Sequence, residues 1–231
     1  MKNLPRKLGW SGGILLLAAC LTGLAGGAET QLYGVQDFSR LKGMKGFSNQ
    51  ALDLHFTLYQ GYVKNANLLL TQLAQMAQQQ QFNTPAYAEL KRRFGWEFNG
   101  MRLHELYFGN LGGAGEINKD GPLYKRLTEN FGTFEQWQAD FKGTGAIRGI
   151  GWAVLYEDPA TGRLLNTWIN EHDVGHLAGG RPLLVMDVFE HAYLPDYGLK
   201  RGDYIEAFFR NIDWPTVESR LSQDAGKGAT K

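Results

Sequence analysis

The spacing of apolar residues in the first half of the chain predicts a long helix. Within residues 48–79, apolar and aromatic side chains recur at steps of three and four. An α-helix has 3.6 residues per turn, so side chains at these steps share one face. The positions on this face are Ala51, His55, Leu58, Tyr62, Ala66, Leu69 and Leu73. A polar run of glutamines, residues 78–81, ends the pattern.

Cap residues and prolines predict further helices. Thr84-Pro85 is an N-cap followed by a proline at the first helical position, so it opens a second long helix. This helix runs to Phe108, and Gly95 is a candidate break within it. Pro122 opens a short helix. The run Thr133-Phe134-Glu135-Gln136 has the form of a capping box and predicts another.

The pattern changes at Gly149, after which strands are expected. Residues 151–157 and 163–170 are rich in β-forming side chains and are separated by a turn sequence, so they predict an antiparallel hairpin. Residues 183–188 are a third candidate strand, and helices resume at 203–210 and after Trp214-Pro215. The predicted fold class is α+β, with a helical hairpin in the N-terminal lobe and a small three-stranded antiparallel sheet flanked by helices in the C-terminal lobe. The expected domains are residues 46–112 and 113–223, with a loose tail at 224–231.

The first residues have the layout of an export signal. Positive charges at Lys2, Arg6 and Lys7 precede an apolar run that is too short to span a bilayer. Residues 17–20, Leu-Ala-Ala-Cys, resemble a bacterial lipoprotein signal box. We therefore expect residues 1–19 to be a signal peptide, Cys20 to be lipidated as a membrane anchor in the cell envelope, and residues 20–45 to be a linker. Ordinary signal cleavage after residues 26–28 is the alternative.

Composition narrows the possible partners. The 24 Lys and Arg residues nearly balance the 23 Asp and Glu residues, so no strong field exists to attract nucleic acid, and no nucleic-acid partner is expected. Cys20 is the only cysteine, so an internal disulfide is excluded and lipidation accounts for its placement. The 13 Phe, 10 Tyr and 6 Trp residues fit either a well-packed core or an aromatic shell around a metal.

The candidate chemistry lies in residues 187–193, Asp-Val-Phe-Glu-His-Ala-Tyr. Asp187 and His191 are four residues apart, and on a helical turn that spacing points both side chains in one direction, as a metal pair requires. His55 lies on the inward face of the first helix, and His104 lies in a strongly aromatic segment of the second. Both histidines can face the same site.

The segment 187–193 closely resembles the D-V-W-E-H-A-Y signature of the iron/manganese superoxide dismutases, with Phe189 in the tryptophan position. The resemblance extends from about residue 46 to Trp214. It is carried by residues 59–67 in the first helix, by 103–108 in the second with Leu103 in place of an asparagine, by Gly-Trp-Ala at 151–153, and by 203–205 and 211–214 near the end. In combination these motifs are specific.

The resemblance implies a function and a set of site residues. His104, Asp187 and His191 match three metal-ligand positions, and Tyr62 matches the tyrosine that lines the substrate funnel. His172 falls where most members carry a glutamine, or sometimes a histidine, that hydrogen-bonds metal-bound solvent, so the resemblance implies that His172 and Tyr62 are the catalytic residues and that His172 tunes the site. The implied cofactor is one Mn or Fe ion per subunit, with superoxide as substrate, and the implied assembly is a homodimer through the region of Glu190.

The fourth ligand is ambiguous. The family's first-helix ligand is a histidine eight residues before the funnel tyrosine, and that position here is Leu54. His55 is seven residues before Tyr62, and one residue turns a side chain by about 100° around a helix axis. We therefore expect His55 to bind only if the helix is shifted or locally wound differently. Leu58 and Leu194 also replace a polar pair of the family, which suggests a rearranged proton supply.

Two other functions remain open from the sequence. Leu54 favours a catalytically silent lipoprotein that keeps the fold as a binding or structural module. His172 and His176 form an H-x-x-x-H pair, which on a helix is a zinc-type arrangement and would favour a zinc-dependent hydrolase. Gly175 and the preceding strand argue against a helix at that point.

Overall fold

The computed structural model describes residues 32–222. The predicted signal peptide, Cys20 and the predicted tail at 224–231 lie outside the described residues. Within the described part, no helix is both long and apolar enough to cross a membrane.

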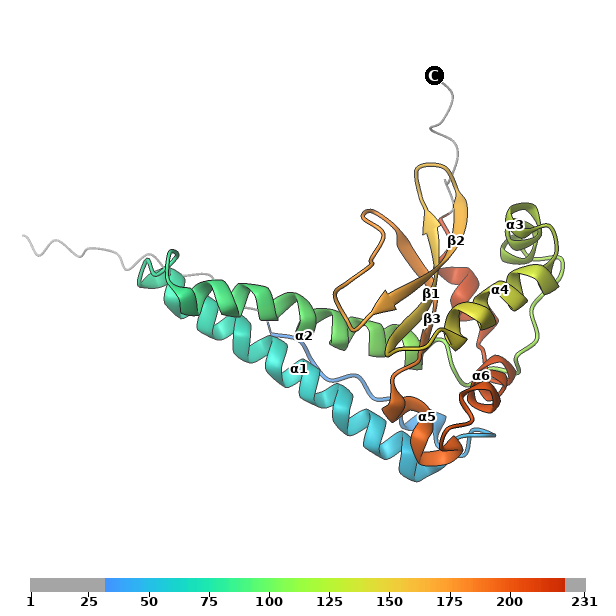
Figure 1. The fold of residues 1–231 in the computed structure, drawn as a ribbon, viewed down its shortest axis with the longest axis horizontal. Helices are drawn as coiled ribbons and strands as arrows, with labels where there is room; N and C mark the ends of the chain where they lie inside the picture. Colours follow the sequence, from blue (N-terminus) through green and yellow to red (C-terminus); the bar gives the residue numbers. More distant parts are fainter. Residues whose placement is uncertain (1–31, 223–231) are drawn as a thin grey trace, which may run out of the picture.

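The N-terminal lobe is a hairpin of two long helices (Figure 1). Helix α1 spans Asn49–Gln78, and the Ser48 side chain caps it by accepting a hydrogen bond from the Ala51 amide (3.0 Å). Helix α2 spans Pro85–Gly109 and is capped by Thr84 in the same way. Both predicted helices are confirmed. The candidate break at Gly95 is wrong, because α2 runs through it without interruption and its packing on α1 outweighs the weak helix propensity of glycine.

Residues 32–45, which the sequence assigns to a linker, lie against this hairpin. The Asn67 side chain accepts a hydrogen bond from the Tyr33 amide (2.8 Å) and donates one to the Tyr33 carbonyl (2.9 Å). Phe38 and Leu41 are buried in the core, and Leu41 ends the short 3-10 helix η1, Ser39–Leu41. This part of the predicted linker therefore belongs to the packed body of the protein.

The C-terminal lobe contains the predicted three-stranded sheet. The strands are β1 (Gly151–Asp158), β2 (Arg163–Asn170) and β3 (Arg181–Asp187), in the antiparallel order β2-β1-β3. The central strand β1 is buried along almost its whole length, as expected for a strand paired on both sides. In the register of β1 with β3, Trp152 faces Asp187, which places an indole beside the end of β3.

Short helices surround the sheet. They are α3 (Pro122–Phe131), α4 (Phe134–Ala146), α5 (Glu190–Tyr197), α6 (Arg201–Arg210) and α7 (Trp214–Ser219). The predicted starts at Pro122 and Thr133 are confirmed, and the Thr133 side chain accepts a hydrogen bond from the Gln136 amide (3.1 Å). In Figure 1, α4 lies beside the sheet and α5 lies below it, near the start of α1.

The end of α2 is joined to β3 by one buried amide side chain. Asn110 donates a hydrogen bond to the Val185 carbonyl (3.2 Å) and accepts one from the Val185 amide (3.0 Å). Asn110 is fully buried, so both bonds are shielded from water. This contact fixes the second helix against the third strand, and it brings His104 on α2 close to Asp187 at the end of β3.

Candidate metal centre

Four ligand-type side chains from four elements converge between the two lobes. They are His55 on α1, His104 on α2, Asp187 at the end of β3 and His191 on α5. One potential ligand atom from each lies within 4.8 Å of all the others. Three of the residues are buried, and the side chain of His191 is 29% exposed. The structure thus brings together every residue that the sequence analysis named as a ligand.

The distances within the cluster centre on one carboxylate oxygen. Asp187 Oδ2 lies 3.1 Å from His191 Nε2 and 3.2 Å from His55 Nε2. His104 Nε2 lies 3.6 Å from the same oxygen. The other oxygen, Oδ1, accepts a hydrogen bond from the Phe189 amide at 2.8 Å. That bond fixes the carboxylate so that Oδ2 points toward the three imidazoles.

His55 reaches the cluster from a regular helix. Helix α1 is α-helical from Asn49 to Gln78, so of the two alternatives, a shifted helix or a local change of winding, the change of winding is absent. His55 and Tyr62 are nearly two turns apart and therefore share the inward face. His55 is 4% exposed, whereas Leu54 is 58% exposed and points away from the core. Of the two candidate positions, only His55 faces Asp187.

Asp187 and His191 do not share a helical turn, which corrects the sequence argument. Asp187 is the last residue of β3, and His191 is the second residue of α5. The chain turns between them, with the Phe189 amide bonded to Asp187 as described above. Both side chains still meet, because the sharp strand-to-helix junction brings them to the same point.

His104 has a fixed tautomer that leaves a lone pair in the cluster. Its Nδ1 lies 2.6 Å from the Gly100 carbonyl, which can only accept a hydrogen bond, so Nδ1 carries the proton. Nε2 is therefore unprotonated, and it has no hydrogen-bond partner among the described residues although it is buried. A buried lone pair that faces a carboxylate is unfavourable unless a cation lies between them.

The electrostatics of the cluster favour neutral imidazoles at His55 and His104 beside an ionised Asp187. Burial lowers the pKa of His55, against the opposing effect of Asp187. Burial, with His55 as a further cause, places the pKa of His104 well below its usual range. Burial alone would raise the pKa of Asp187, but its contacts with His191 and His55 hold it well below the ordinary value. Neutral imidazole nitrogens and a carboxylate oxygen are ligands that suit iron or manganese.

Tyr62 and His172 form a hydrogen-bonded pair beside this cluster. His172 Nε2 lies 2.8 Å from the Tyr62 hydroxyl, and the Trp152 indole N–H donates to His172 Nδ1 (3.0 Å). An indole can only donate, so Nδ1 is the acceptor and Nε2 carries the proton. Burial lowers the pKa of His172 to about 4 and raises that of Tyr62. His172 therefore donates to Tyr62, whose own proton stays available.

Four residues that the sequence analysis did not single out shape the surroundings. The ring of Trp96 lies 4.5 Å from that of His172 and 5.5 Å from that of Tyr62. The Tyr204 hydroxyl donates to the Asp187 backbone carbonyl at 2.5 Å. Trp152 and Gly100 complete this set. Of these four residues, only Gly100 could have been found by its position in the sequence, because a residue four positions before His104 lies on the same face of the helix.

Gly100 makes room for Tyr62. A β-carbon at this position would lie 2.6 Å from Tyr62 Cδ1, far inside van der Waals contact. The Gly100 carbonyl also accepts the proton of His104. One glycine thus supports a ligand and the tyrosine beside it.

The zinc-type pair of the sequence analysis does not form. Both ring nitrogens of His172 are hydrogen-bonded, as described above. In His176, Nδ1 lies 2.8 Å from the Tyr156 hydroxyl and Nε2 lies 2.8 Å from the His172 carbonyl. Neither histidine directs a lone pair toward a shared point, so the geometry does not favour a zinc hydrolase.

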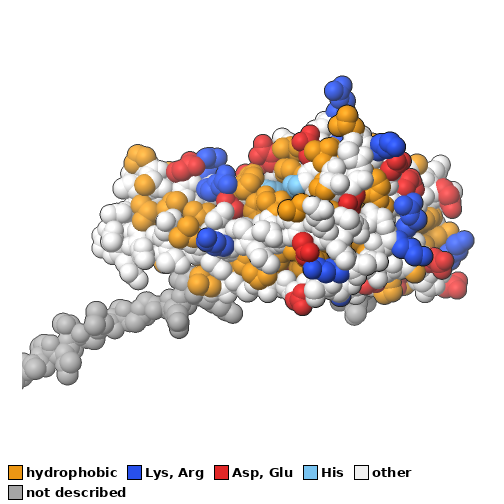
Figure 2. All heavy atoms as spheres, turned by 90° about the horizontal axis from the view of Figure 1, so that it is seen from below, with side chains coloured by type: hydrophobic (Ala, Val, Ile, Leu, Met, Phe, Trp, Pro, Cys, Tyr) orange, Lys and Arg blue, Asp and Glu red, His pale blue; other side chains and the backbone are white. Residues whose placement is uncertain are grey.

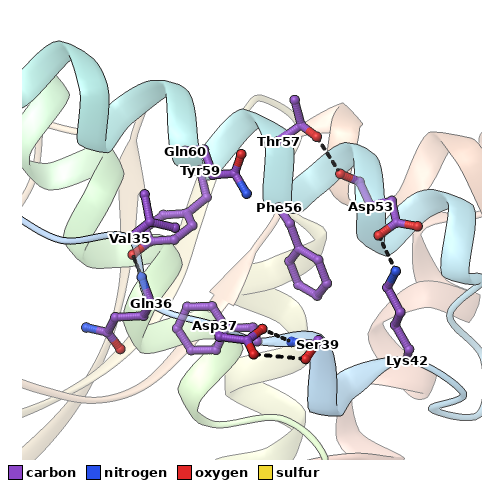
Figure 3. Close-up of a pocket in the computed structure, with 11 residues that line it drawn as sticks. Val35, Gln36, Asp37, Ser39, Lys42, Asp53, Phe56, Thr57, Tyr59 and Gln60 are labelled. Atoms are coloured by element: carbon purple, nitrogen blue, oxygen red, sulfur yellow. Dashed lines mark hydrogen bonds and ion pairs between the residues drawn. The ribbon is translucent and has the colours of Figure 1, made fainter.

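One surface hollow lies away from the cluster. It has a volume of about 500 Å³ and is lined by the segment 35–42 and by one side of α1 (Figure 3). None of the four clustered residues lines it. On the face shown in Figure 2, histidine atoms are visible at the surface among hydrophobic side chains.

Comparison with known proteins identifies the family. The profile "Iron/manganese superoxide dismutases, C-terminal domain" matches residues 119–220. A protein named superoxide dismutase [Mn] 2 from Haloferax volcanii is 36% identical over 177 residues, which cover 76% of this chain and 87% of the relative. The chain belongs to the iron/manganese superoxide dismutase family.

Relatives of this dismutase family carry either metal in their names. A superoxide dismutase [Fe] from Cupriavidus metallidurans is 36% identical over 184 residues, covering 78% of this chain and 90% of the relative. A superoxide dismutase [Fe] from Aquifex aeolicus is 36% identical over 193 residues, covering 81% and 90%. The identity to iron-named and manganese-named relatives is equal, so it does not discriminate between the two metals.

Proposed function

We propose that this protein converts two superoxide anions and two protons into dioxygen and hydrogen peroxide, and that it uses one iron or manganese ion per chain. The observation that carries the proposal is the convergence of three imidazoles on Asp187 Oδ2, together with the buried lone pair of His104. A cation bound by the four residues would relieve the unfavourable approach of this lone pair to the carboxylate. The donor set fits the metals named in the family.

In this proposal, four residues hold the ion and other groups orient them. His55, His104, Asp187 and His191 would hold the ion, which when bound supplies a one-electron redox couple between its divalent and trivalent states. The backbone amide of Phe189 and the carbonyl of Gly100 orient two of these ligands through hydrogen bonds. Tyr204 holds the backbone at Asp187. Ligand orientation is thus set by groups that do not touch the ion.

The proton supply is assigned to Tyr62 and His172. The Tyr62 ring lies 5.1 Å from the ring of His104, so Tyr62 packs directly against one of the ligand-type side chains. Because His172 donates a hydrogen bond to that hydroxyl, the phenolic proton of Tyr62 can be directed toward a reduced oxygen species. The hydrogen bond from His172 also stabilises the oxygen while its proton is away. Trp152 keeps His172 in the tautomer that this requires.

Aromatic rings exclude water from this pair. Phe189 takes the place of the family's tryptophan and stacks on His191, with ring centroids 5.3 Å apart. The Phe189 ring also lies 4.8 Å from that of His172. The Trp96 ring packs against both members of the pair. Electrostatic interactions are stronger inside such a shell than in water, which supports proton transfer between the positioned groups.

The assembly proposed here is a homodimer through the region of Glu190. Glu190 is exposed at the start of α5, next to the partly exposed His191. Leu194, on the next turn, is a large apolar residue that is 39% exposed. A second copy over this face would cover both His191 and Leu194. Sedimentation of the purified chain tests this, and a strict monomer at micromolar concentration would contradict it.

We place the protein in the cell envelope, anchored through lipid on Cys20. Support comes from the charged and apolar pattern of residues 1–19 and from the single cysteine that follows. Mass spectrometry of the membrane fraction tests the proposal. A mature chain that begins at Glu29, or a soluble pool that is unaffected by Cys20→Ser, would overturn it.

The catalytically silent alternative has lost its main support. That alternative rested on Leu54, and His55 fills the missing position in the cluster. Elemental analysis of the purified mature chain is the first test of the proposed function. We expect close to one equivalent of iron plus manganese, and a chain that takes up neither metal from solution would contradict the proposal.

A further inference from the structure

The turn that carries His172 has an unusual pattern of burial. It follows β2, and its neighbours Glu171, Asp173 and Val174 are exposed, yet His172 is completely buried. Glu171 has a left-handed backbone with φ of 52°, a conformation that non-glycine residues rarely adopt. A conformation of this kind persists only when surrounding contacts hold it.

Backbone pairing closes the turn at one end. The Asn170 amide donates to the Val174 carbonyl (2.9 Å), and the Val174 amide donates to the Asn170 carbonyl (3.3 Å). These two bonds bring residues 170 and 174 together, but they do not fix the peptide of His172 between them. The only described side chain that hydrogen-bonds this peptide's carbonyl is His176.

His176 is itself held in a single orientation. The His172 carbonyl can only accept, so His176 Nε2 carries the proton at that contact (2.8 Å). Nδ1 is then the acceptor for the Tyr156 hydroxyl, also at 2.8 Å. Tyr156 is buried on the central strand β1, and burial raises its pKa to about 12, so the hydroxyl keeps the proton that it donates.

We propose that His176 is a positioning residue of the reaction, which with Tyr156 fixes the peptide of His172 so that the His172 ring can donate to Tyr62. The hydrogen bonds run from β1 to the turn: Tyr156 donates to His176, and His176 donates to the His172 carbonyl. Trp152 and Tyr62 then hold the His172 ring at its two nitrogens. Backbone and ring are thus fixed by separate partners. This inference deepens the proposed function, on which its catalytic consequence rests.

The decisive experiment is a double-mutant cycle in the metal-loaded mature chain. His176→Leu should slow superoxide removal by about tenfold, the lower end of the range for groups that orient a site from outside it. His172→Ala should slow it at least as much. If His176 acts through His172, adding His176→Leu to His172→Ala should cause no further loss. Independent losses that multiply in the double variant would overturn the proposal.

Two further variants separate positioning from general packing. Gln can place an N–H where His176 Nε2 lies, so His176→Gln should recover most of the lost rate, and no recovery would count against the hydrogen bond to His172. Val174→Ala is the matched control, because its side chain is 56% exposed in the same turn. It should leave the rate unchanged.

Hydrogen exchange provides a readout that does not depend on dismutase activity. In the full mature chain, His176→Leu should speed exchange of the amides at 170–176 severalfold, while the amides of α1 keep their protection. Unchanged exchange in this turn would overturn the positioning role even in an active enzyme. Faster exchange in a chain without dismutase activity would instead support the positioning contact and contradict the proposed function.

Discussion

His55 Nε2 and Asp187 Oδ2 lie 3.2 Å apart, although 132 positions separate the two residues in the sequence. One comes from the first long helix and the other from the end of the last strand. Neither lobe alone contains the full set of ligand-type side chains, so the cluster exists only when the lobes are packed together. Loss of metal binding can therefore follow from a disturbed packing of the two lobes as well as from the loss of a ligand.

The first prediction concerns the choice between positions 54 and 55. His55→Ala should weaken metal binding by at least about tenfold to a hundredfold, the loss that even an outer-shell partner of a ligand causes. Leu54→His should change neither metal content nor rate, because residue 54 is exposed and points away from Asp187. Elemental analysis and superoxide consumption of both variants check this. A gain of activity in Leu54→His would refute the assignment of His55.

The second prediction concerns Asp187. Asp187→Ala should leave a folded protein that binds no metal and whose melting temperature no longer rises when metal is added. For the unaltered chain, a metal present at 1,000 times its dissociation constant should stabilise the fold by about 4 kcal/mol. Calorimetry with and without metal makes the comparison, and Asp173→Ala, which removes an exposed acid, is the control. Full occupancy in Asp187→Ala would show that Asp187 is not a ligand.

The third prediction uses two glycines of the same helix. Gly100→Ala should destabilise the protein by about 1–3 kcal/mol, the usual cost of overpacking, because the new methyl group overlaps the Tyr62 ring. It should also lower the rate by displacing Tyr62. Gly95→Ala has no atom within 4 Å of the new methyl group, so it should be neutral or stabilising by up to about 1 kcal/mol. Equal effects of the two substitutions on unfolding would contradict the role of Gly100.

The fourth prediction is a pH dependence of stability that arises from His172. Its pKa is about 4 in the folded chain, whereas an ordinary histidine has a pKa of 6.5, so between these values the unfolded chain binds a proton that the folded chain does not. Stability should therefore fall as the pH drops from 6.5 to about 4, with a contribution on the order of 3 kcal/mol. Denaturant unfolding of the unaltered chain and of His172→Gln, at matched metal content, measures it. Identical slopes against pH in both would contradict the shifted pKa.

Much of the fold follows from local patterns. The inward face of α1 is a periodic stripe, and the starts of α2 and α4 each carry a capping side chain, so local chemistry sufficed to predict these three helices. The strands followed from β-rich runs around a turn. The predicted break at Gly95 was wrong because one glycine destabilises a helix only slightly, and packing between α1 and α2 compensates for this loss.

The site was less predictable, because its geometry depends on contacts between distant segments. The identities of the ligand-type residues came from the family resemblance, but the placement of Asp187 at a strand end did not. The local stripe of α1 placed His55 on the inward face, but that His55 meets Asp187 depends on how α1 packs against the C-terminal lobe, which no local pattern specifies. Trp96, Trp152 and Tyr204 act on the site through single hydrogen bonds or ring contacts, and these leave no periodic trace in a sequence.

The most direct test of the account is the decay of superoxide followed spectroscopically in the presence of the purified mature chain. Samples should be loaded with iron or manganese and compared with the metal-free chain and with Asp187→Ala treated in the same way. We expect decay that is first order in enzyme, fast with at least one of the two metals and at background level in both controls. Background decay with full occupancy of either metal would contradict the central claim that this site removes superoxide.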